Sequence, residues 1–394
     1  MKILIGADTY APDVNGAARF TQRLAAGLHW RGHDVHVVAP SPIGAPRVER
    51  LDGVTVHRLR SHRLPGHDTF RVCLPPLVAR DVARIVTRVG PDVVHTQAHL
   101  VLGRCLAGPV ARAGLPFVAT NHLMPENLLD QGRVPHALRP AAARWMWRDL
   151  ARVVSGADVV TAPTPRAVQL LVDRAGLTHA RAVSCGIDPT PYARAAARAR
   201  RHPAPVPTVL FVGRLDPEKR VGDLIRAFAA LPADCAARLE IVGDGMQGST
   251  WRDLARGLGV GERVTFRGFV SEAELAQAYG RADVFVMPSI AELQSLVTLE
   301  AMSAHTPVVA ADAMALPHLV HPGENGFLYP PGDVAALRDH LATLLRDPAL
   351  RERLGARSAQ LVGEHALGAT LAEFEAIYAE AIGRRGRPAW RAAA

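Results

Sequence analysis

Two basic and two acidic side chains follow short apolar runs in the second half of the chain, at spacings that would bring them to one sheet edge. Arg214 and Lys219 follow the run that ends at Gly213, and Glu292 and Glu300 follow a later run. Because the carboxyl ends of parallel strands meet at one edge of a sheet, we expect these four side chains to lie close together. Arg214 can fork onto a diphosphate and Lys219 adds a point charge, which would neutralise a leaving group that gains negative charge.

The same edge should also hold a glycine turn and the start of a helix. Gly243-Asp-Gly245 follows another apolar run, and its glycines let the backbone come close to a phosphate. Amides of Leu296, Val297 and Thr298 would begin the helix that carries Glu300, and free amides at a helix start bind phosphate oxygens. Taken singly, each of these charged residues is better explained as an ordinary helix-terminal or solvated side chain. All four in this order favour a site for a sugar carried on a nucleoside diphosphate.

These motifs resemble those of retaining glycosyltransferases of family 4, a large bacterial group. The resemblance covers nearly the whole chain and includes the segments 8–16, 120–122 and 183–188. It implies an α/β fold of the GT-B type, with two facing Rossmann-like domains and a cleft between them. It also implies a hexosyltransferase that takes a hexose from a UDP- or GDP-sugar to a hydroxyl acceptor. Because the chain has no Asp-x-Asp pair to bind a divalent metal, we expect it to be metal-independent and to need no cofactor.

The resemblance assigns roles to individual positions of this sequence. The residues expected in catalysis are Glu292, His122, Arg214 and Lys219. The residues expected to bind the donor are Gly16, Arg214, Lys219, Gly243, Phe269, Val270, Glu292, Leu296, Val297, Thr298 and Glu300. His122 would meet the sugar, Glu300 the ribose, and Phe269 and Val270 would lie near the base. Similar enzymes often have a glycine where this chain has His305, which puts the neighbouring turn in doubt.

Length and patterning predict two domains. A chain of 394 residues exceeds the size at which one core keeps growing, and 48% hydrophobic residues can fill two cores. Apolar runs that alternate with helical stretches are typical of doubly wound folds, and Ser271 with Glu274 predicts a capping box. The expected division is an acceptor-binding domain over 1–190, a proline-rich linker over 191–207, a nucleotide-sugar-binding domain over 208–370, and a helix and tail over 371–394 that can cross back to the first domain.

Charge is distributed unevenly along the chain. Residues 1–203 hold 27 Arg and Lys against 14 Asp and Glu, whereas residues 204–394 hold 19 against 23. A basic amino-terminal half could attract anionic lipid headgroups, or the arginines could reflect a high-GC genome. The helix expected near Trp145 and Trp147 carries four arginines, which suits a membrane interface. Because these two rings diverge by about 200° on a helix, at least one of them should be in the core.

Other site types are less favoured by the residues. His95 and His99 have the spacing of two helical zinc ligands, but they follow a strand and have no acidic third partner. The run 243–248 matches a dinucleotide fingerprint, but it falls in the middle of its domain rather than after the first strand. No nucleic-acid motif accompanies the positive charge.

Compartment and acceptor complete the expectations. Cys73, Cys105, Cys185 and Cys235 are widely spaced, which suits reduced thiols in a cytoplasm, with possible docking at the inner face of the plasma membrane. Similar sequences that share the motif at 294–300 include transferases that act on diacylglycerol-type lipids, so a membrane glycolipid acceptor is the first choice. A soluble acceptor, such as a secondary metabolite or thiol precursor, is the alternative within the same chemistry. A nucleotide-sugar 2-epimerase or a non-catalytic nucleotide-sugar-binding protein are alternatives of other classes.

Overall fold

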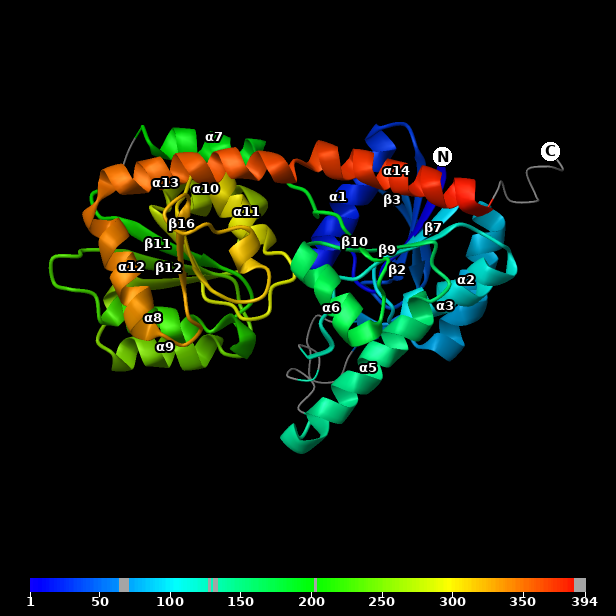
Figure 1. Cartoon of the computed structure of the whole chain (residues 1–394), viewed down its shortest axis with the longest axis horizontal. Helices are drawn as coiled ribbons and strands as arrows, with labels where there is room; N and C mark the ends of the chain where they lie inside the picture. Colours follow the sequence, from blue (N-terminus) through cyan, green and yellow to red (C-terminus); the bar gives the residue numbers. More distant parts are fainter. Residues whose placement is uncertain (64–70, 127–128, 130–133, 202–203, 386–394) are drawn as a thin grey trace. The chain divides into compact units, whose positions relative to one another are not determined.

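The computed structural model describes residues 1–63, 71–126, 129, 134–201 and 204–385, and the chain divides into two compact units. Unit 1 consists of Met1–Cys185 with Gly368–Ala394, and unit 2 consists of Gly186–Leu367. Each unit contains its own sheet with helices packed on it (Figure 1). In the described part of the chain, no helix combines the length and the apolar character that a membrane crossing requires.

Unit 1 is built on an eight-stranded sheet in the order β10-β9-β8-β7-β1-β2-β4-β3. All neighbours are parallel except β3, which runs antiparallel to β4 at the edge. The strands are β1 (Lys2–Gly6), β2 (Asp34–Pro40), β3 (Arg47–Leu51), β4 (Val54–Leu59), β7 (Val93–Thr96), β8 (Phe117–Thr120), β9 (Val159–Ala162) and β10 (Arg181–Ala182). A small antiparallel pair joins β5 (His62–Arg63) to β6 (Arg71–Val72). Since β1 lies between β2 and β7, the strand order reverses at β1, which is where doubly wound sheets bind ligands.

The helices of unit 1 include one that comes from the far end of the chain. They are α1 (Gly16–Trp30), α2 (Pro75–Val89), α3 (Val101–Arg112), α5 (Arg139–Val154), α6 (Pro165–Ala175) and α14 (Leu367–Arg385). Most of α14 belongs to unit 1 (Figure 1). There Glu375 forms an ion pair with Arg31 at 2.8 Å, and Phe374 packs against Phe20. The carboxy-terminal helix therefore completes the core of the amino-terminal unit.

Unit 2 is built on a six-stranded parallel sheet in the order β13-β12-β11-β14-β15-β16. The strands are β11 (Thr208–Val212), β12 (Arg238–Val242), β13 (Val264–Gly268), β14 (Val284–Met287), β15 (Val308–Ala311) and β16 (Gly326–Tyr329). The helices are α7 (Thr190–Ala199), α8 (Val221–Ala229), α9 (Gly248–Gly257), α10 (Glu272–Arg281), α11 (Leu296–Ser303), α12 (Val334–Arg346) and α13 (Pro348–Leu361). The strand order reverses between β11 and β14, so the loops after these strands are the expected place for a ligand.

Local sequence explains most of these elements. Runs such as Phe117–Thr120 and Val284–Met287 are buried along their whole length, as strands covered on both faces must be. The capping box of Ser271 and Glu274 is present at the start of α10, as predicted. In the segment expected to link the domains, residues 190–199 form α7, which contacts α10, and residues 202–203 lie outside the described part.

The turn after α11 adopts the left-handed conformation although it lacks a glycine. His305 has a φ of 59°, in the region that glycine adopts most readily, and its amide donates to the carbonyl of Met302 at 3.0 Å. The turn at which similar enzymes often have a glycine thus has the backbone conformation that glycine favours. His305 is locally strained there.

Candidate functional site

Arg214 follows β11 and is held by two acidic side chains of its own loop. One guanidinium nitrogen lies 2.6 Å from Asp216 Oδ2 and another lies 3.0 Å from Glu218 Oε1. The arginine side chain is 43% exposed, whereas both carboxylates are 6% exposed. The buried acids therefore orient a cation whose outer part remains accessible.

Lys219 and Glu292, which are 73 residues apart in sequence, are brought together as an ion pair. Their side chains are only 15% and 11% exposed. The loops that carry them are also joined through the backbone, because the amide of Ile290 donates to the carbonyl of Glu218 at 3.1 Å. The loops after β11 and β14 thus form one structure, as the strand reversal between them allows.

The predicted glycine turn after β12 packs directly against the Arg214 loop. Gly243 has a φ of 122°, and a Cβ atom there would lie 2.0 Å from the carbonyl oxygen of Gly213. The amide of Leu215 donates to the carbonyl of Asp244 at 3.0 Å, and Asp216 Oδ1 accepts from the amide of Met246 at 3.3 Å. Glycine is therefore required at this position by close contact between two loops.

Glu300 lies on α11 and is almost fully buried. Its Oε2 accepts a hydrogen bond from the hydroxyl of Tyr279 at 2.9 Å. Tyr279 is itself buried on α10, where its ring meets Tyr192 edge-on. Sequence reasoning missed Tyr279, although the capping box predicted the helix that carries it.

The remaining donor-site candidates of unit 2 lie in loops or at a helix start. Leu296 and Val297 begin α11, and the amide of Thr298 donates to the carbonyl of Ser295 at 3.2 Å. Phe269 and Val270 follow β13, with the Phe269 side chain largely exposed.

Glu218 is a second residue that sequence reasoning did not single out. Burial raises the pKa of its carboxyl, and its Oε2 has no hydrogen-bond partner within the described structure. A buried carboxylate with one unsatisfied oxygen and one arginine contact is costly to keep charged. The signal in the sequence was its position immediately before Lys219.

In unit 1, Gly16 and His122 are brought to the same end of α1. Gly16 is the first residue of this helix, and Asn15 caps it by accepting from the amide of Ala18 at 2.9 Å. Phe20, one turn further on, packs against His122 with the two rings tilted and their centroids 4.8 Å apart. A side chain at Gly16 would meet nothing within 4 Å, so the space over the helix start is open in the described structure.

His122 is held by a neutral hydrogen bond rather than by a charge. Its Nε2 lies 2.9 Å from Oε1 of Gln97, and burial lowers its pKa to about 4. His95 is fully buried, and burial lowers its pKa to about 3. Among the described residues, no group of His, Cys, Asp or Glu side chains is arranged to hold a metal ion.

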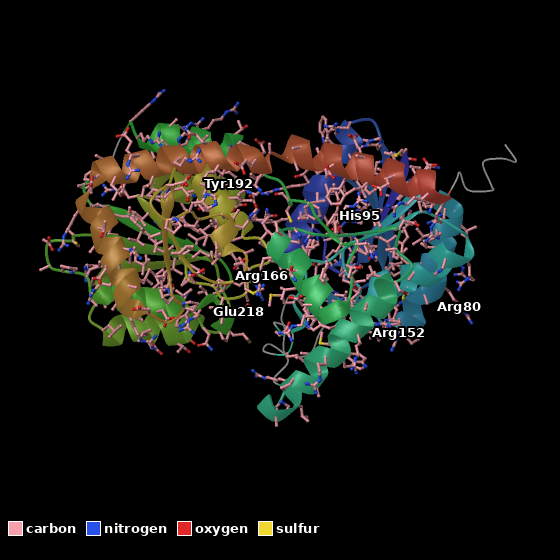
Figure 2. The ribbon with its side chains drawn as sticks, in the orientation of Figure 1. Arg80, His95, Arg152, Arg166, Tyr192 and Glu218 are labelled. Atoms are coloured by element: carbon pink, nitrogen blue, oxygen red, sulfur yellow. The ribbon has the colours of Figure 1, made fainter. Side chains whose placement is uncertain are left out.

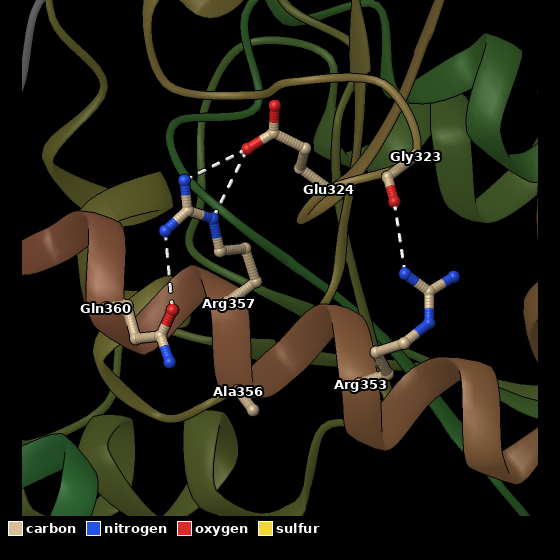
Figure 3. A pocket seen from close by; sticks show the side chains of 6 residues that line it. All are labelled: Gly323, Glu324, Arg353, Ala356, Arg357 and Gln360. Atoms are coloured by element: carbon tan, nitrogen blue, oxygen red, sulfur yellow. Dashed lines mark hydrogen bonds and ion pairs between the residues drawn. The ribbon is translucent and has the colours of Figure 1, made fainter.

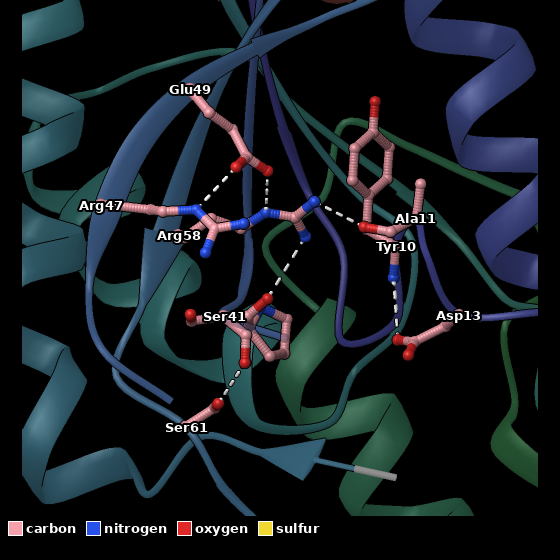
Figure 4. A network of polar contacts seen from close by, with 9 residues as sticks. Tyr10, Ala11, Asp13, Ser41, Arg47, Glu49, Arg58 and Ser61 are labelled. Atoms are coloured by element: carbon pink, nitrogen blue, oxygen red, sulfur yellow. Dashed lines mark hydrogen bonds and ion pairs between the residues drawn. The ribbon is translucent and has the colours of Figure 1, made fainter. Parts of the chain in front are cut away.

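A buried arginine braces the loop that leads to Gly16 (Figure 4). Arg58 on β4 has a side chain that is 3% exposed, and it donates to Glu49 at 2.7 Å and to the carbonyls of Pro40 and Ala11. Its guanidinium also lies over the ring of Tyr10. The loop before α1 is therefore tied to the sheet.

Asp8, near the start of the loop that follows β1, is a further carboxylate near the strand reversal. Its Oδ1 accepts from the amide of Leu102 at the start of α3, at 2.9 Å, and Oδ2 has no hydrogen-bond partner among the described residues. Burial raises its pKa to about 6.

Two surface hollows lie away from the predicted site residues. One, of about 430 Å³, is lined by Gly323, Glu324, Arg353, Ala356, Arg357 and Gln360 (Figure 3). Its arginines are already engaged, since Arg357 contacts Glu324 at 3.1 Å and Arg353 donates to the carbonyl of Gly323 at 3.4 Å. The other, of about 410 Å³, lies where the end of α1 meets the turn after β3. Neither suggests a donor site.

The helix rich in tryptophan and arginine divides its two rings as predicted. Trp147 is buried and donates from Nε1 to Glu126 at 3.0 Å, whereas Trp145 is 63% exposed. Arg144, Arg148 and Arg152 of the same helix are exposed. One aromatic ring therefore anchors α5 and the other faces solvent beside basic side chains.

Comparison with known proteins matches each half of the chain to a glycosyltransferase family model. The model of glycosyltransferase family 4 matches residues 14–191, and that of glycosyl transferases group 1 matches residues 194–361. A GDP-mannose-dependent alpha-mannosyltransferase of Mycobacterium tuberculosis is 32% identical over 381 residues, which cover 93% of this chain and 96% of that protein. A D-inositol 3-phosphate glycosyltransferase of Nocardia farcinica is 32% identical over 88% of this chain and 80% of its own.

Solved structures agree with this assignment at the level of the fold. The sucrose-phosphate synthase of Thermosynechococcus elongatus has a TM-score of 0.82 and 24% identity, over 98% of this chain and all of that one. The chain therefore belongs to glycosyltransferase family 4, is a glycosyltransferase, and has the GT-B fold of two Rossmann-like domains.

Proposed function

We propose that this enzyme transfers a hexose from a UDP- or GDP-sugar to a hydroxyl acceptor and retains the configuration of the anomeric carbon. The observation that carries the proposal is the buried Lys219–Glu292 pair, on the same two loops that present Arg214. Because a relative is named a GDP-mannose-dependent mannosyltransferase, GDP-mannose is the first donor to test.

The contacts of the two cations of unit 2 support a role as a diphosphate clamp. Arg214 is preoriented by Asp216 and Glu218, so little side-chain entropy is lost when it meets the donor. Negative charge from a diphosphate would further raise the pKa of Glu218, which burial has already raised. Proton uptake by Glu218 would then release the guanidinium to the phosphate.

In the transfer step, the bond between the anomeric carbon and the diphosphate oxygen breaks while Arg214 and Lys219 stabilise the leaving charge. The acceptor oxygen bonds to the same face of the sugar, and its proton passes to an oxygen of the leaving phosphate. Glu292 faces the sugar, and Glu300, oriented by Tyr279, holds the ribose. Because the cations and helix amides balance the diphosphate charge, the reaction needs no divalent metal.

The first-choice acceptor is a diacylglycerol-type or other membrane glycolipid, reached by a cytoplasmic protein docked at the inner face of the plasma membrane. The exposed Trp145 with Arg144, Arg148 and Arg152 supports this choice. A soluble, phosphorylated acceptor is the second candidate, favoured by the relative named a D-inositol 3-phosphate glycosyltransferase. A 2-epimerase remains the alternative from another class.

The test is release of nucleotide from a panel of nucleotide sugars, with membrane lipid extract, with soluble polyols and their phosphates, or with no acceptor. Lipid-dependent release supports the glycolipid, and polyol-dependent release supports the soluble acceptor. Sugar conversion without any acceptor indicates an epimerase. Excess chelator should leave the rate nearly unchanged, and a loss that magnesium restores would contradict the metal-independent site.

Membrane docking is tested separately with vesicles. The protein should sediment with anionic vesicles at low salt and release above about 0.3 M salt, where the Debye length is roughly 6 Å. Replacing Arg144, Arg148 and Arg152 by Gln should weaken the association. As a matched control, replacing Arg226, Arg256 and Arg338 of unit 2 by Gln should not weaken the association, although these substitutions also remove positive charge from helix surfaces. Equal loss of vesicle binding in both variants would show a general effect of net charge and would contradict docking through α5.

A further inference from the structure

A chain of buried polar side chains links the carboxy-terminal helix to His122. His95 lies on β7 (Figure 2). Its Nδ1 is 2.7 Å from the hydroxyl of Tyr378 on α14, and its Nε2 is 2.6 Å from Oγ1 of Thr120. Thr120 in turn contacts Thr161 at 2.6 Å. His95, Tyr378 and Thr161 are fully buried, so their contacts are not exchanged with water.

Gln97 connects this group to His122. Its amide nitrogen lies 3.3 Å from Nδ1 and 3.2 Å from Nε2 of His95. The hydroxyls of Tyr378 and Thr120 occupy the in-plane positions at the two ring nitrogens. Because the Gln97 amide nitrogen is nearly equidistant from both ring nitrogens, it lies against the face of the ring. An N–H is attracted to an aromatic face and a carbonyl oxygen is not. This contact orients the amide so that Oε1 faces His122, 2.9 Å from its Nε2.

The orientation of Gln97 decides which nitrogen of His122 carries the proton. A neutral imidazole has one N–H, and a carboxamide oxygen can only accept. Burial lowers the pKa of His122 to about 4, so the ring is neutral at pH 7. The proton must then lie on Nε2, which leaves Nδ1 as a hydrogen-bond acceptor.

We propose that Gln97 is a positioning residue that holds His122 in the Nε2–H tautomer, and that Tyr378 sets Gln97 through His95. The proposal rests on the proposed function for its consequence, since His122 is there expected to contact the donor sugar. An Nδ1 acceptor selects a sugar hydroxyl that donates, which makes the tautomer a determinant of sugar binding. Helix α14 thereby acts on a residue near the middle of unit 1.

The decisive measurement is long-range proton–nitrogen NMR of histidine rings in the full-length protein, with the His122 signal assigned by its loss in His122→Ala. The wild type should show the Nε2–H pattern. Gln97→Leu removes the acceptor at similar volume and should give a mixture of tautomers. Gln97→Glu keeps the acceptor, so it should retain the Nε2–H pattern and raise the pKa of His122 through the added charge. Tyr378→Phe should give a smaller change in the direction of Gln97→Leu.

His57 serves as an internal control in the same spectra. Burial lowers the pKa of His57 to about 4. His57 on β4 contacts His36 on β2, and both strands lie on the opposite side of β1 from β7, which carries His95. A general loosening of unit 1 would shift the NMR signals of both His57 and His122, whereas the proposed effect shifts only the signal of His122. An unchanged His122 tautomer in Gln97→Leu overturns the proposal. Should that variant not fold, an unchanged pKa of His122 in Gln97→Glu overturns it instead.

Activity then separates this inference from the proposed function. With an active donor, kcat/KM of Gln97→Leu should fall about tenfold, the value of about one hydrogen bond to the sugar. Gln97→Glu should move the acidic limb of the pH profile toward neutral pH, because protonated His122 cannot accept from a hydroxyl. A tautomer change without any change in transfer would refute the role of His122 at the sugar while leaving the assignment of Gln97 intact.

Discussion

The two units gather polar side chains at their sheet edges by opposite electrostatic means. In unit 2, Arg214 and Lys219 are paired with buried carboxylates, so the edge is a set of oriented charges. In unit 1, His122 is held by Gln97, which itself lies against His95, and burial keeps both histidines neutral. A charged edge suits a group that gains negative charge, whereas a neutral edge suits hydroxyl groups. The same type of sheet thus supports two kinds of recognition.

The difference also predicts which unit is sensitive to acid. Burial lowers the pKa of His57 and His99 to about 4, as for His122, and that of His95 to about 3. As pH falls, each of these histidines binds its proton in the unfolded state before it does so in the folded state. The stability that each buried neutral histidine supports is therefore complete above pH 6.5 and is lost as pH falls toward the folded pKa.

The largest expected effect is therefore loss of unit 1 stability between pH 7 and 5.5. Each of these histidines should contribute about 1 kcal/mol of the loss. Asp8 partly offsets this loss, because its buried carboxylate destabilises the folded state when charged and becomes protonated over the same pH range. Pulse proteolysis in urea, with fragments mapped by mass spectrometry, should show unit 1 opening before unit 2 at pH 5.5. Replacing His57 by Phe should reduce the acid sensitivity. Earlier opening of unit 2, where burial lowers the pKa of fewer histidines, would contradict the comparison.

The second effect concerns the charges of unit 2. Arg214→Ala and Lys219→Ala should each lower turnover about 100-fold or more, because they act on charge that develops in the transition state. Lys219→Ala should also destabilise unit 2, since it leaves buried Glu292 without its cation. Lys219→Met combined with Glu292→Gln should restore stability but not turnover. Arg226→Ala, an exposed control on α8, should be nearly silent, and near-normal turnover in either site variant would remove that residue from the site.

A third effect distinguishes the two glutamates. Glu300→Gln should raise the donor KM about tenfold through lost ribose hydrogen bonds, whereas Glu292→Gln should mainly lower kcat. Tyr279→Phe, which removes only the hydroxyl that orients Glu300, should weaken donor binding in the same direction as Glu300→Gln but less. Steady-state kinetics with saturating acceptor provides the measurement. Identical losses of donor affinity in both glutamate variants would mean that their roles are assigned wrongly.

The smallest effect tests the backbone of the turn after α11. His305→Gly relieves the left-handed strain but increases the entropy of the unfolded chain, so it should change stability by at most about 1 kcal/mol. His305→Ala keeps the strain and removes the ring, and it should be less stable than the glycine variant. Denaturant titration compares the two. A glycine variant that is less stable than the alanine variant would show that this turn does not carry the strain.

Much of the architecture was accessible from local sequence. The short apolar runs that alternate with helical stretches in the sequence include the strands Phe117–Thr120, Val159–Ala162, Val284–Met287 and Val308–Ala311. Such runs are informative because a strand buried on both faces needs apolar residues at every position. Charges placed just after these runs indicated the sheet edge of unit 2, since all parallel strands end on the same side.

What local sequence could not supply were contacts between distant elements. Lys219 with Glu292, Tyr279 with Glu300, and Tyr378 with His95 are joined across 73, 21 and 283 residues. Each pairing depends on which face a helix presents and which strands become neighbours, and these are decided by packing of the whole unit. Composition and spacing therefore established the residue types and the edge at which they gather. Only the folded chain decided which carboxylate orients which cation and which helix holds the histidine, because hydrogen bonds and ion pairs require positions that tertiary packing alone sets.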